Sequence, residues 1–345
     1  MTHVAICCDI GPDYGANRLV RSLGLAEELA IRGASVAFVC DAEPSRWAQM
    51  QLGARGIEWT PPEDTPDKFV RLLGRLEVDA AVFDSATLVG DVCAAVRKGG
   101  LPTLAVVDGA VGDAEADVVV DPGVEADKAR PAVGDGSTVL TGPDYVPMRN
   151  DVLANRPVSR PRRDSVEVPR VMAVFDNPDT APAVGPVARL LVETGRPFEA
   201  TFVMTDAEAS EEVLAVRPAP RQQFAVATPT WRLHDQLARS DVVLGAAGPA
   251  TYEWLCMGAS LGLVWVSEDQ VERYRRLMIH RAVVGLGSAD DLAGGSVAGV
   301  EKMTRLLSDV RERARLAETG WRLVDGLGRA RVADALLDLL GSREG

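Results

Sequence analysis

The sequence predicts an α/β protein built from two halves, each with a parallel sheet covered by helices. Short apolar runs of strand length alternate with longer amphipathic segments through most of the 345 residues, as in doubly wound sheets. A chain of this length also exceeds one ordinary core, and Arg149–Pro169 has the Pro- and Arg-rich composition of a domain connection. We therefore expect an N-terminal domain over 1–150, a linker over 151–168, a second domain over 169–320, and a C-terminal helix in 321–345 that can pack back on the first domain.

In the first half, each expected strand is a short apolar run, and each expected helix repeats apolar residues at helical spacing. The expected strands are Val4–Cys8, Ser35–Val39, Ala80–Phe83, Thr103–Val107 and Val118–Val120. The expected helices are Arg18–Arg32, Ser45–Leu52, Asp67–Leu76 and Leu88–Arg97. A carboxylate follows each strand, at Asp9, Asp41, Asp84, Asp108 and Asp121. Such residues line the ligand-binding edge of open α/β sheets, although each one alone is also a common turn cap.

The second half repeats the alternation of strands and helices. Its expected strands are Arg170–Phe175, Glu199–Met204, Gln223–Ala227, Val242–Leu244 and Leu261–Val266. Its expected helices are Ala183–Thr194, Glu208–Val216, Trp231–Arg239 and Pro249–Met257. The sequence thus predicts two Rossmann-like halves of similar size, and proteins of this kind commonly bind ligands in the cleft between the halves.

Composition narrows the classes of partner. The net charge is -13, so the protein repels phosphate backbones and anionic membrane surfaces, and we expect no nucleic-acid or membrane partner. No apolar stretch reaches the ~20 residues of a membrane helix, and the N-terminus lacks the pattern of a secretory signal. Five scattered cysteines without a C-x-x-C pair indicate reduced thiols rather than disulfides or a zinc site. We expect a cytoplasmic protein that acts on small molecules; its oligomeric state is not indicated.

The segment SDVVLGAAGPATYEW, residues 240–254, carries the clearest chemistry in the second half. A strand ends in small residues up to Gly248, and Pro249 takes the helical position that needs no amide partner. The next three amides would then be free to face an anion such as a diphosphate. They belong to Ala250, Thr251 and Tyr252. Glu253 could accept hydrogen bonds from ribose hydroxyls, but a glycine-rich turn that serves only helix–sheet packing explains the same residues.

This segment, with Asp269 and Gln270 after the next strand, resembles the donor-binding region of the two-domain GT-B sugar-nucleotide enzymes. Within them it is most similar to the PseG/SpsG group, which is related to MurG. Three further motifs support the resemblance, and all four occur in order along the chain. GPDYVPMR, residues 142–149, is similar to the group's interdomain G-x-x-Y-x-x-x-R element. ADVVVD, residues 116–121, is similar to its late N-domain strand, and LVDGLGRARV, residues 323–332, resembles its D-G-x-G-x-x-R-V signature.

The resemblance implies a GT-B fold and a donor that carries UDP. It implies that Glu253 binds the nucleotide ribose and that Gln270, beside Asp269, meets the hydroxyls of the donor sugar. The diphosphate would lie against Gly248, Ala250, Thr251 and Tyr252. Tyr145 and Arg149 would sit at the hinge near the cleft, and a purely structural interdomain contact is the alternative for that pair.

The sequence departs from the group in two places. In the opening turn CCDIGPDYGANRLVR, residues 7–21, the group has G-x-G-H-x-x-R with a histidine that activates water, and alignment on Arg21 puts Arg18 at the histidine position. The histidines of the chain are His3, His234 and His280; the last two are expected to be ordinary surface residues on helices. Where the group has a glycine pair, this chain has Asp176 and Asn177, which would change shape and charge beside the sugar or acceptor.

The opening turn and the strand ends beside it contain the candidate catalytic residues. Arginine cannot act as a base at neutral pH because its pKa exceeds ~12. We therefore expect Arg18 to bind the donor diphosphate, or a carboxylate of the sugar or acceptor. Asp13, next to the cleft residue Tyr14, is the first candidate for the base because it lies in the turn, and Asp9 and Asp84 follow. Turn capping is the alternative role for each of these carboxylates.

These features favour a glycosyltransferase of specialised metabolism that moves a sugar from a UDP-sugar to a small-molecule acceptor. The resemblance extends to the cytosylglucuronate synthases of actinomycetes, which makes UDP-glucuronate and cytosine a candidate pair. A UDP-sugar hydrolase with a substitute base and a non-catalytic sugar-nucleotide-binding protein are the alternatives. We expect no cofactor and no metal, because helix amides and arginine can carry the leaving diphosphate and no Asp-x-Asp element is evident.

Overall fold

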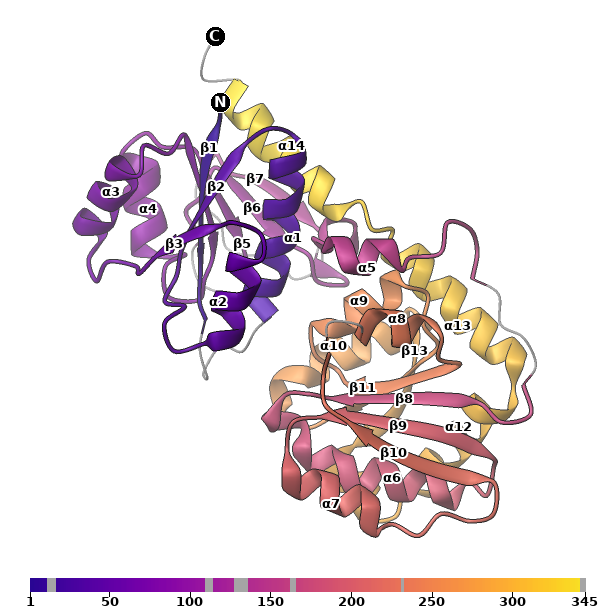
Figure 1. The fold of residues 1–345 in the computed structure, drawn as a ribbon. Coiled ribbons are helices and arrows are strands. Elements are labelled where there is room, and N and C mark those ends of the chain that lie inside the picture. The colour runs from indigo at the N-terminus through magenta and orange to yellow at the C-terminus, as the bar shows by residue number, and fades with distance from the viewer. Residues whose placement is uncertain (11–16, 109–113, 127–135, 162–165, 231–232, 342–345) are drawn as a thin grey trace. The chain divides into compact units, whose positions relative to one another are not determined.

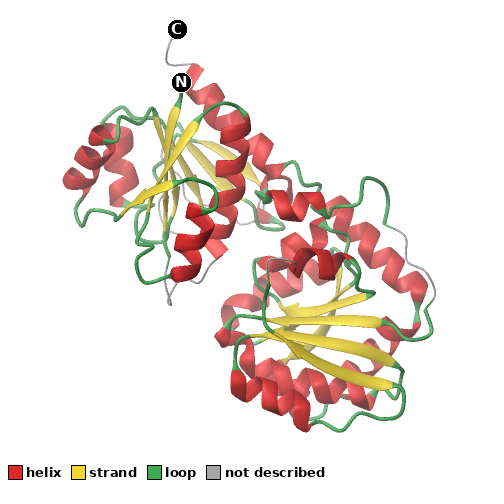
Figure 2. Cartoon of the chain, viewed as in Figure 1, coloured by secondary structure: helices red, strands yellow, loops and turns green. Residues whose placement is uncertain are grey.

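The chain folds into two compact units (Figure 1). The structure is a computed structural model that describes residues 1–10, 17–108, 114–126, 136–161, 166–230 and 233–341. Unit 1 comprises Met1–Asn150 and Gly326–Gly345, and unit 2 comprises Asp151–Asp325. Each unit has one sheet whose described strand pairs are all parallel, with helices packed on it (Figure 2). The predicted class, α/β with two Rossmann-like parallel sheets, is confirmed.

Unit 1 has a seven-stranded sheet in the order β3-β2-β1-β4-β5-β6-β7. Its strands are β1 His3–Cys8, β2 Ser35–Val39, β3 Glu58–Thr60, β4 Ala80–Asp84, β5 Thr103–Val106, β6 Val118–Asp121 and β7 Thr138–Thr141. Its helices are α1 Asn17–Ile31, α2 Arg46–Gly53, α3 Pro66–Arg75, α4 Asp91–Lys98, the 3-10 turn η2 Pro143–Tyr145 and α14 Gly328–Gly341. The sequence did not predict β3 and β7. Both edge strands are short and partly exposed, so neither forms an apolar run.

Strand β1 shows how the core of unit 1 forms on both faces of its sheet. Val4 and Ile6 pack on one face, with α1 and the last helix, α14. Ala5 and Cys7 pack on the other face, against residues of α3 and α4. Because strand side chains alternate between faces, a fully apolar β1 can serve both layers. Helix α14 therefore contributes to the core that the first strand of the chain begins.

Two of the sequence motifs meet in unit 1 through glycines. A Cβ atom on Gly24 of α1 would lie 2.9 Å from the carbonyl carbon of Met148, and one on Gly328 would overlap the carbonyl oxygen of Val146. The guanidinium of Arg329 also donates to the carbonyl of Met148 and to Oδ1 of Asn150, at 3.3 and 2.7 Å. The segment around Tyr145–Arg149 is thus packed between α1 and α14, which supports a structural role for this motif.

Unit 2 has a six-stranded sheet in the order β10-β9-β8-β11-β12-β13. Its strands are β8 Arg170–Phe175, β9 Phe198–Met204, β10 Gln222–Ala227, β11 Val242–Ala246, β12 Leu261–Trp265 and β13 Val283–Ser288. Its helical segments are α5 Asn150–Ala154, η3 Pro178–Ala183, α6 Val184–Glu193, α7 Ala207–Ala215, α8 Leu233–Ala238, α9 Ala250–Cys256, α10 Glu268–Ile279, α11 Ala289–Ala293, α12 Val297–Ser308 and α13 Val310–Leu323. The unpredicted strand β13 contains Gly285, where a Cβ atom would meet Tyr274 and Met278 of α10.

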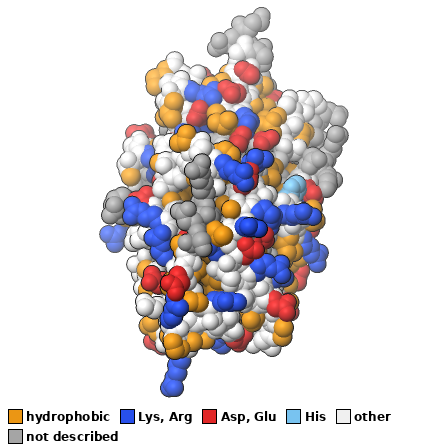
Figure 3. All heavy atoms as spheres, turned by 90° about the vertical axis from the view of Figure 1, so that its right-hand side faces the viewer, with side chains coloured by type: hydrophobic (Ala, Val, Ile, Leu, Met, Phe, Trp, Pro, Cys, Tyr) orange, Lys and Arg blue, Asp and Glu red, His pale blue; other side chains and the backbone are white. Residues whose placement is uncertain are grey.

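The structure also shows how charged side chains are distributed on one face and where the cysteines lie. On the face drawn in Figure 3, basic and acidic side chains lie among one another rather than in separate regions. All five cysteines are buried and reduced. None of the described helices is long and apolar enough to cross a membrane.

Candidate functional site

The strand orders place a candidate site at the carboxyl edge of each sheet. The direction of strand succession reverses between β8 and β11 in unit 2, and between β1 and β4 in unit 1. Open α/β sheets bind ligands beyond the carboxyl ends of the strands at such a reversal. The residues that follow these strands in each unit therefore form the candidate sites.

In unit 2 the turn after β11 is held from two sides. The amide of Ala247 donates to the carbonyl of Val264 on β12, at 2.9 Å. The carbonyl of Ala247 accepts a hydrogen bond from Nη1 of Arg273 on α10, at 3.1 Å. Residues 246–249 thus form a backbone turn that is fixed by the next strand and by an arginine from the next helix.

Two glycines of this turn have different roles. A Cβ atom on Gly245 would lie 2.5 Å from the ring of Trp254, so Gly245 is needed for the packing of α9 on the sheet. A Cβ atom on Gly248 would meet no heavy atom within 4 Å. Packing therefore explains Gly245 but does not explain Gly248, which leaves open space beside the turn.

The first turn of α9 differs from the expectation of three free amides. The amide of Thr251 donates to the carbonyl of Gly248, and that of Tyr252 donates to the carbonyl of Pro249, both at 3.1 Å. Pro249 already has helical dihedral angles, φ -60 and ψ -31, so the chain closes this turn on itself. Among the described residues only the Ala250 amide of these three lacks a partner. The role of the three residues toward a ligand stays a prediction.

Helix α10 carries the polar residues Asp269, Gln270 and Arg273, and the last of these contacts the turn. Gln270 is buried, and its Oε1 accepts a hydrogen bond from the amide of Val266 at 3.0 Å; no acceptor for its Nε2 is found in the part of the chain that the structure describes. Asp269 is exposed. Arg273 is half-buried, and within the described ranges it has no acidic partner. Sequence reasoning missed Arg273, although its position three residues after Gln270 puts both on one helix face.

His234 is buried on α8 between two carboxylates, whereas the sequence predicts an ordinary surface residue on a helix. Its Nε2 lies 3.0 Å from Oε2 of Glu253, and its Nδ1 lies 3.1 Å from Oδ2 of Asp151. Burial lowers the pKa of His234, but the bonds and charges of these carboxylates outweigh burial and raise it to about 9. Glu253 is thus paired with a cation at neutral pH.

Asp176 and Asn177 follow β8 at the same edge. Oδ1 of Asn177 accepts from the amide of Asp179 at 3.1 Å and caps η3, which is a local structural role. Asp176 is exposed by surface area, but loss of hydration next to the protein raises the pKa of its carboxyl. The negative charge of Glu253 also raises this pKa, and His234 lowers it. Asp176 therefore lies within electrostatic reach of the Glu253–His234 pair.

In unit 1 the corresponding edge is a network of paired charges. Nε and Nη2 of Arg21 donate to the two oxygens of Asp84, each at 2.6 Å. Arg21 also donates to Asp108, at 2.6 and 3.0 Å. Arg18 donates to Asp9 at 3.1 Å, and its Nε lies 3.8 Å from Asp84. The sequence predicted acidic residues at this edge but not their pairing with α1.

This network bears on the predicted catalytic residues. Asp84 is 1% exposed and its two oxygens are engaged by Arg21, which makes it unsuitable as a base that meets a substrate. Asp9 accepts bonds from Ser85, Ala86 and Arg18. A substrate anion would have to compete with two carboxylates for Arg18. Asp13 and Tyr14 lie outside the described residues.

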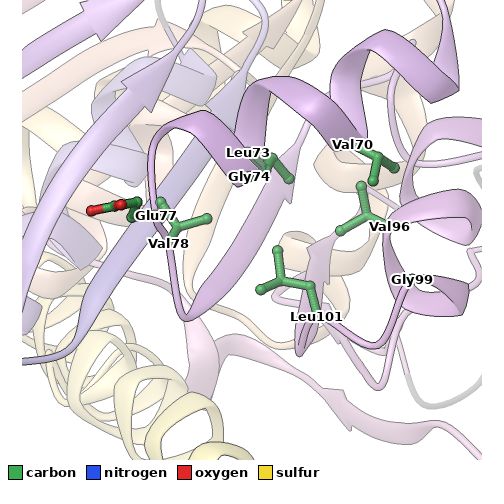
Figure 4. A pocket seen from close by; sticks show the side chains of 8 residues that line it. All are labelled: Val70, Leu73, Gly74, Glu77, Val78, Val96, Gly99 and Leu101. Atoms are coloured by element: carbon green, nitrogen blue, oxygen red, sulfur yellow. The ribbon is translucent and has the colours of Figure 1, made fainter.

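An apolar pocket of about 240 Å³ lies in unit 1, away from either edge (Figure 4). Its lining comes from α3, α4 and the segments that lead into β4 and β5: Val70, Leu73, Gly74, Glu77, Val78, Val96, Gly99 and Leu101. These segments lie at the amino ends of the strands, opposite the carboxyl edge. Within the described part of the chain, no group of three or more His, Cys, Asp or Glu residues could hold a metal ion.

Comparison with known proteins extends over nearly the whole chain. No protein-family model matches. The spore coat polysaccharide biosynthesis protein SpsG of Bacillus subtilis (strain 168) is 22% identical over 341 residues, 98% of each chain. Among solved structures, MurG of Acinetobacter baumannii has a TM-score of 0.68 and 16% identity and covers 98% of this chain and 100% of its own.

Two further solved structures contain a nucleoside diphosphate. MnaA of S. aureus with UDP has a TM-score of 0.66 and 13% identity, over 98% of both chains. The spinosyn rhamnosyltransferase SpnG with thymidine diphosphate has a TM-score of 0.60 and 15% identity, over 97% of this chain and 100% of its own. The predicted GT-B fold and the resemblance to the SpsG and MurG group are confirmed.

Proposed function

We propose that this GT-B protein is a glycosyltransferase that transfers a sugar from a UDP-sugar to a small-molecule acceptor, with the donor bound at the carboxyl edge of unit 2. The observation that carries the proposal is the turn after β11. It combines open space beside Gly248 with a guanidinium, that of Arg273, which has no acidic partner among the described residues. That combination suits an anion close to the backbone.

The diphosphate is assigned to this turn on grounds of charge. Arg273 keeps its guanidinium at the turn through one bond to a carbonyl, and a guanidinium can bind a phosphate oxygen through two parallel bonds. The Ala250 amide adds a donor. Positive charge from arginine can stabilise the leaving diphosphate, so the reaction is proposed to proceed without a metal or other cofactor.

The rest of the donor is assigned to neighbouring residues of the same edge. Glu253 would accept bonds from the ribose hydroxyls, because its carboxylate is fixed by His234 and stays 13% exposed. Nε2 of Gln270 would donate to a sugar hydroxyl, since the Val266 amide already holds the Oε1 end of the same side chain. Asp269, exposed at the start of α10, is the second candidate for a sugar hydroxyl.

In the proposed reaction an acceptor O–H or N–H gives up its proton as the acceptor atom bonds to the anomeric carbon. The bond from that carbon to the diphosphate oxygen breaks, and UDP leaves. We assign proton acceptance to Asp13. An Asp13→Asn variant should bind UDP as the wild type does and turn over more slowly, because the amide keeps the shape and loses the basicity. Wild-type turnover in this variant would remove Asp13 from the mechanism.

The deciding experiment is a panel of UDP-sugars incubated with and without acceptors, in EDTA and in Mg²⁺, with UDP and free sugar measured. UDP release only with an acceptor supports the transferase. Sugar release without an acceptor means a UDP-sugar hydrolase, and tight binding without turnover means a nucleotide-sugar-binding protein. UDP-glucuronate with cytosine is the first pair to test. A dTDP-sugar arm tests the choice of nucleotide, because thymidine diphosphate, with which SpnG was solved, differs from UDP in a base methyl group and in the missing 2′-hydroxyl.

A further inference from the structure

The three-residue group Asp151–His234–Glu253 of unit 2 has a geometry that favours a protonated histidine. Nδ1 of His234 lies 3.1 Å from Asp151, and Nε2 lies 3.0 Å from Glu253. Each ring nitrogen contacts a carboxylate oxygen, and an imidazolium, which carries a proton on both nitrogens, can donate to both ionised carboxylates. The imidazole is only 9% exposed, whereas Asp151 is 39% exposed. A buried cation thus ties Glu253 to a more accessible carboxylate.

The charges around His234 come from several elements. Asp151 is on α5 and Glu253 is on α9, and Asp176 at the end of β8 interacts electrostatically with both His234 and Glu253. Asp235, the next residue on α8, accepts a hydrogen bond from Asn155 at 3.1 Å. The imidazolium therefore offsets the repulsion of Glu253 by the carboxylates of Asp151 and Asp176, and it holds the Glu253 carboxylate in one position.

We propose that His234 is a positioning residue for the donor nucleotide: by fixing the Glu253 carboxylate, it gives the protein its preference for a ribonucleoside diphosphate over the deoxy analogues. This rests on the proposed donor site, in which Glu253 meets the ribose. A carboxylate that is already oriented loses little entropy when it accepts a hydroxyl, whereas an analogue without that hydroxyl forgoes this hydrogen bond. Selectivity for the hydroxyl is thus the property that depends on His234.

The electrostatics support this role. The pKa of His234 is raised to about 9, so the imidazolium persists at neutral pH. Above about pH 9 the neutral ring keeps one proton for two carboxylates, and in the tautomer that keeps this proton on Nδ1 the hydrogen bond to Glu253 is lost. The preference for the ribonucleotide should therefore fall as the pH rises past this value.

The test compares dissociation constants for UDP, 2′-deoxy-UDP and 3′-deoxy-UDP by titration calorimetry. Two His234 variants separate the two contacts. The side-chain amide of His234→Gln replaces Nε2 and can still donate to Glu253, whereas that of His234→Asn replaces Nδ1 and reaches only Asp151. We expect His234→Asn to reduce the ribose preference by about tenfold, with the weaker deoxy analogue bound as before, and His234→Gln to keep most of it.

Glu253→Gln is the reference variant, and it separates this proposal from the proposed function. We expect it to abolish the preference, and we expect His234→Asn to have no further effect on that background. The wild-type preference should fall above about pH 9, and that of His234→Asn should not change there. If Glu253→Gln abolishes the preference while both His234 variants keep it, the positioning role is wrong and the donor site stands. If Glu253→Gln leaves UDP affinity and the preference unchanged, or the wild type does not bind UDP, the donor site itself is wrong.

A folding defect would be visible in thermal unfolding of each variant. If His234→Asn does not fold, His234→Gln decides by its pH profile. Its amide does not titrate, so its ribose preference must stay constant across the range in which the wild-type preference falls. A parallel fall in His234→Gln would overturn the proposal.

Discussion

The carboxyl edges of the two sheets share a reversal in the order of their strands, but their charged side chains are paired differently. In unit 1 both arginines of the edge, Arg18 and Arg21, are paired with carboxylates that end neighbouring strands. In unit 2 the cation at the turn, Arg273, bonds only a carbonyl among the residues that the structure describes, and the carboxylate Glu253 is paired with a histidine. A negatively charged nucleotide gains more from an arginine that it need not take from a carboxylate. The strand order therefore indicates two possible sites, and the pairing of arginines with carboxylates distinguishes unit 1 from unit 2.

The largest effect is expected from the unit 1 network. Arg21→Met would leave Asp84, which is 1% exposed, without its guanidinium. Breaking a buried pair from one side costs roughly 3–5 kcal/mol of unfolding free energy, measurable by urea denaturation. The control is Arg75→Met, which breaks an exposed pair with Glu63 and should change stability by less than about 1 kcal/mol. Similar small effects in both variants would mean that the edge of unit 1 is not structural.

The next effect is on the pH dependence of stability, and it comes from unit 2. The folded-state pKa of His234 is raised from 6.5 to about 9. The contribution of His234 to the free energy of unfolding is therefore complete below pH 6.5 and is lost as the pH rises to about 9. The shift corresponds to roughly 3 kcal/mol. Wild-type stability should decline over this window, and His234→Gln should lack that part of the decline. Parallel curves for the two proteins would contradict the assignment of a buried imidazolium.

A smaller effect is expected on donor affinity from α10. Arg273→Gln should weaken UDP binding by about tenfold or more, the usual cost of a lost charged hydrogen bond, with little change in stability. Arg275→Gln is the matched control, because Arg275 is exposed and points away from Arg273 around the helix. Titration calorimetry with UDP compares them. Equal affinities in the two variants would remove Arg273 from the diphosphate site.

The smallest effect is expected at Gly248, and its neighbour Gly245 serves as the comparison. Gly245→Ala should lower stability by about 1–3 kcal/mol, because the added methyl overlaps Trp254. Gly248→Ala has room for its methyl, so stability should stay nearly unchanged while UDP binds a few-fold more weakly. Denaturant melts and calorimetry on both variants give the comparison. A Gly248→Ala variant with full UDP affinity would mean that the ligand does not approach the turn there.

The sequence predicted what depends on local pattern. Buried strands such as β1 and β8 form continuous apolar runs and were identified, whereas β7 is partly exposed and β13 is interrupted by glycines. The acidic edge of unit 1 was predicted because each carboxylate stands at the end of a strand or within two residues of it. The pairing of Arg21 with Asp84 was not predicted, because the two residues are brought together only by the tertiary fold.

The same distinction explains the errors in unit 2. The sequence does not indicate that His234 is buried, because its partners Asp151 and Glu253 are distant in the sequence. The Thr251 and Tyr252 amides were expected to be free because the pattern does not show that Pro249 already begins the helical turn. Arg273 resembled any other arginine of an amphipathic helix until its contact with Ala247 was known.

The return of α14 to unit 1 determines the order in which the protein can be completed during synthesis. Unit 2 is one continuous segment, Asp151–Asp325, and can close its core as soon as that segment has left the ribosome. Unit 1 begins first, but its core includes Val332, Ala333 and Leu336 of α14, so it remains open until the later unit has been made. Its apolar sheet face must stay protected from aggregation over that whole interval. A nascent chain of this protein is therefore expected to depend on chaperones for the unit that emerges first.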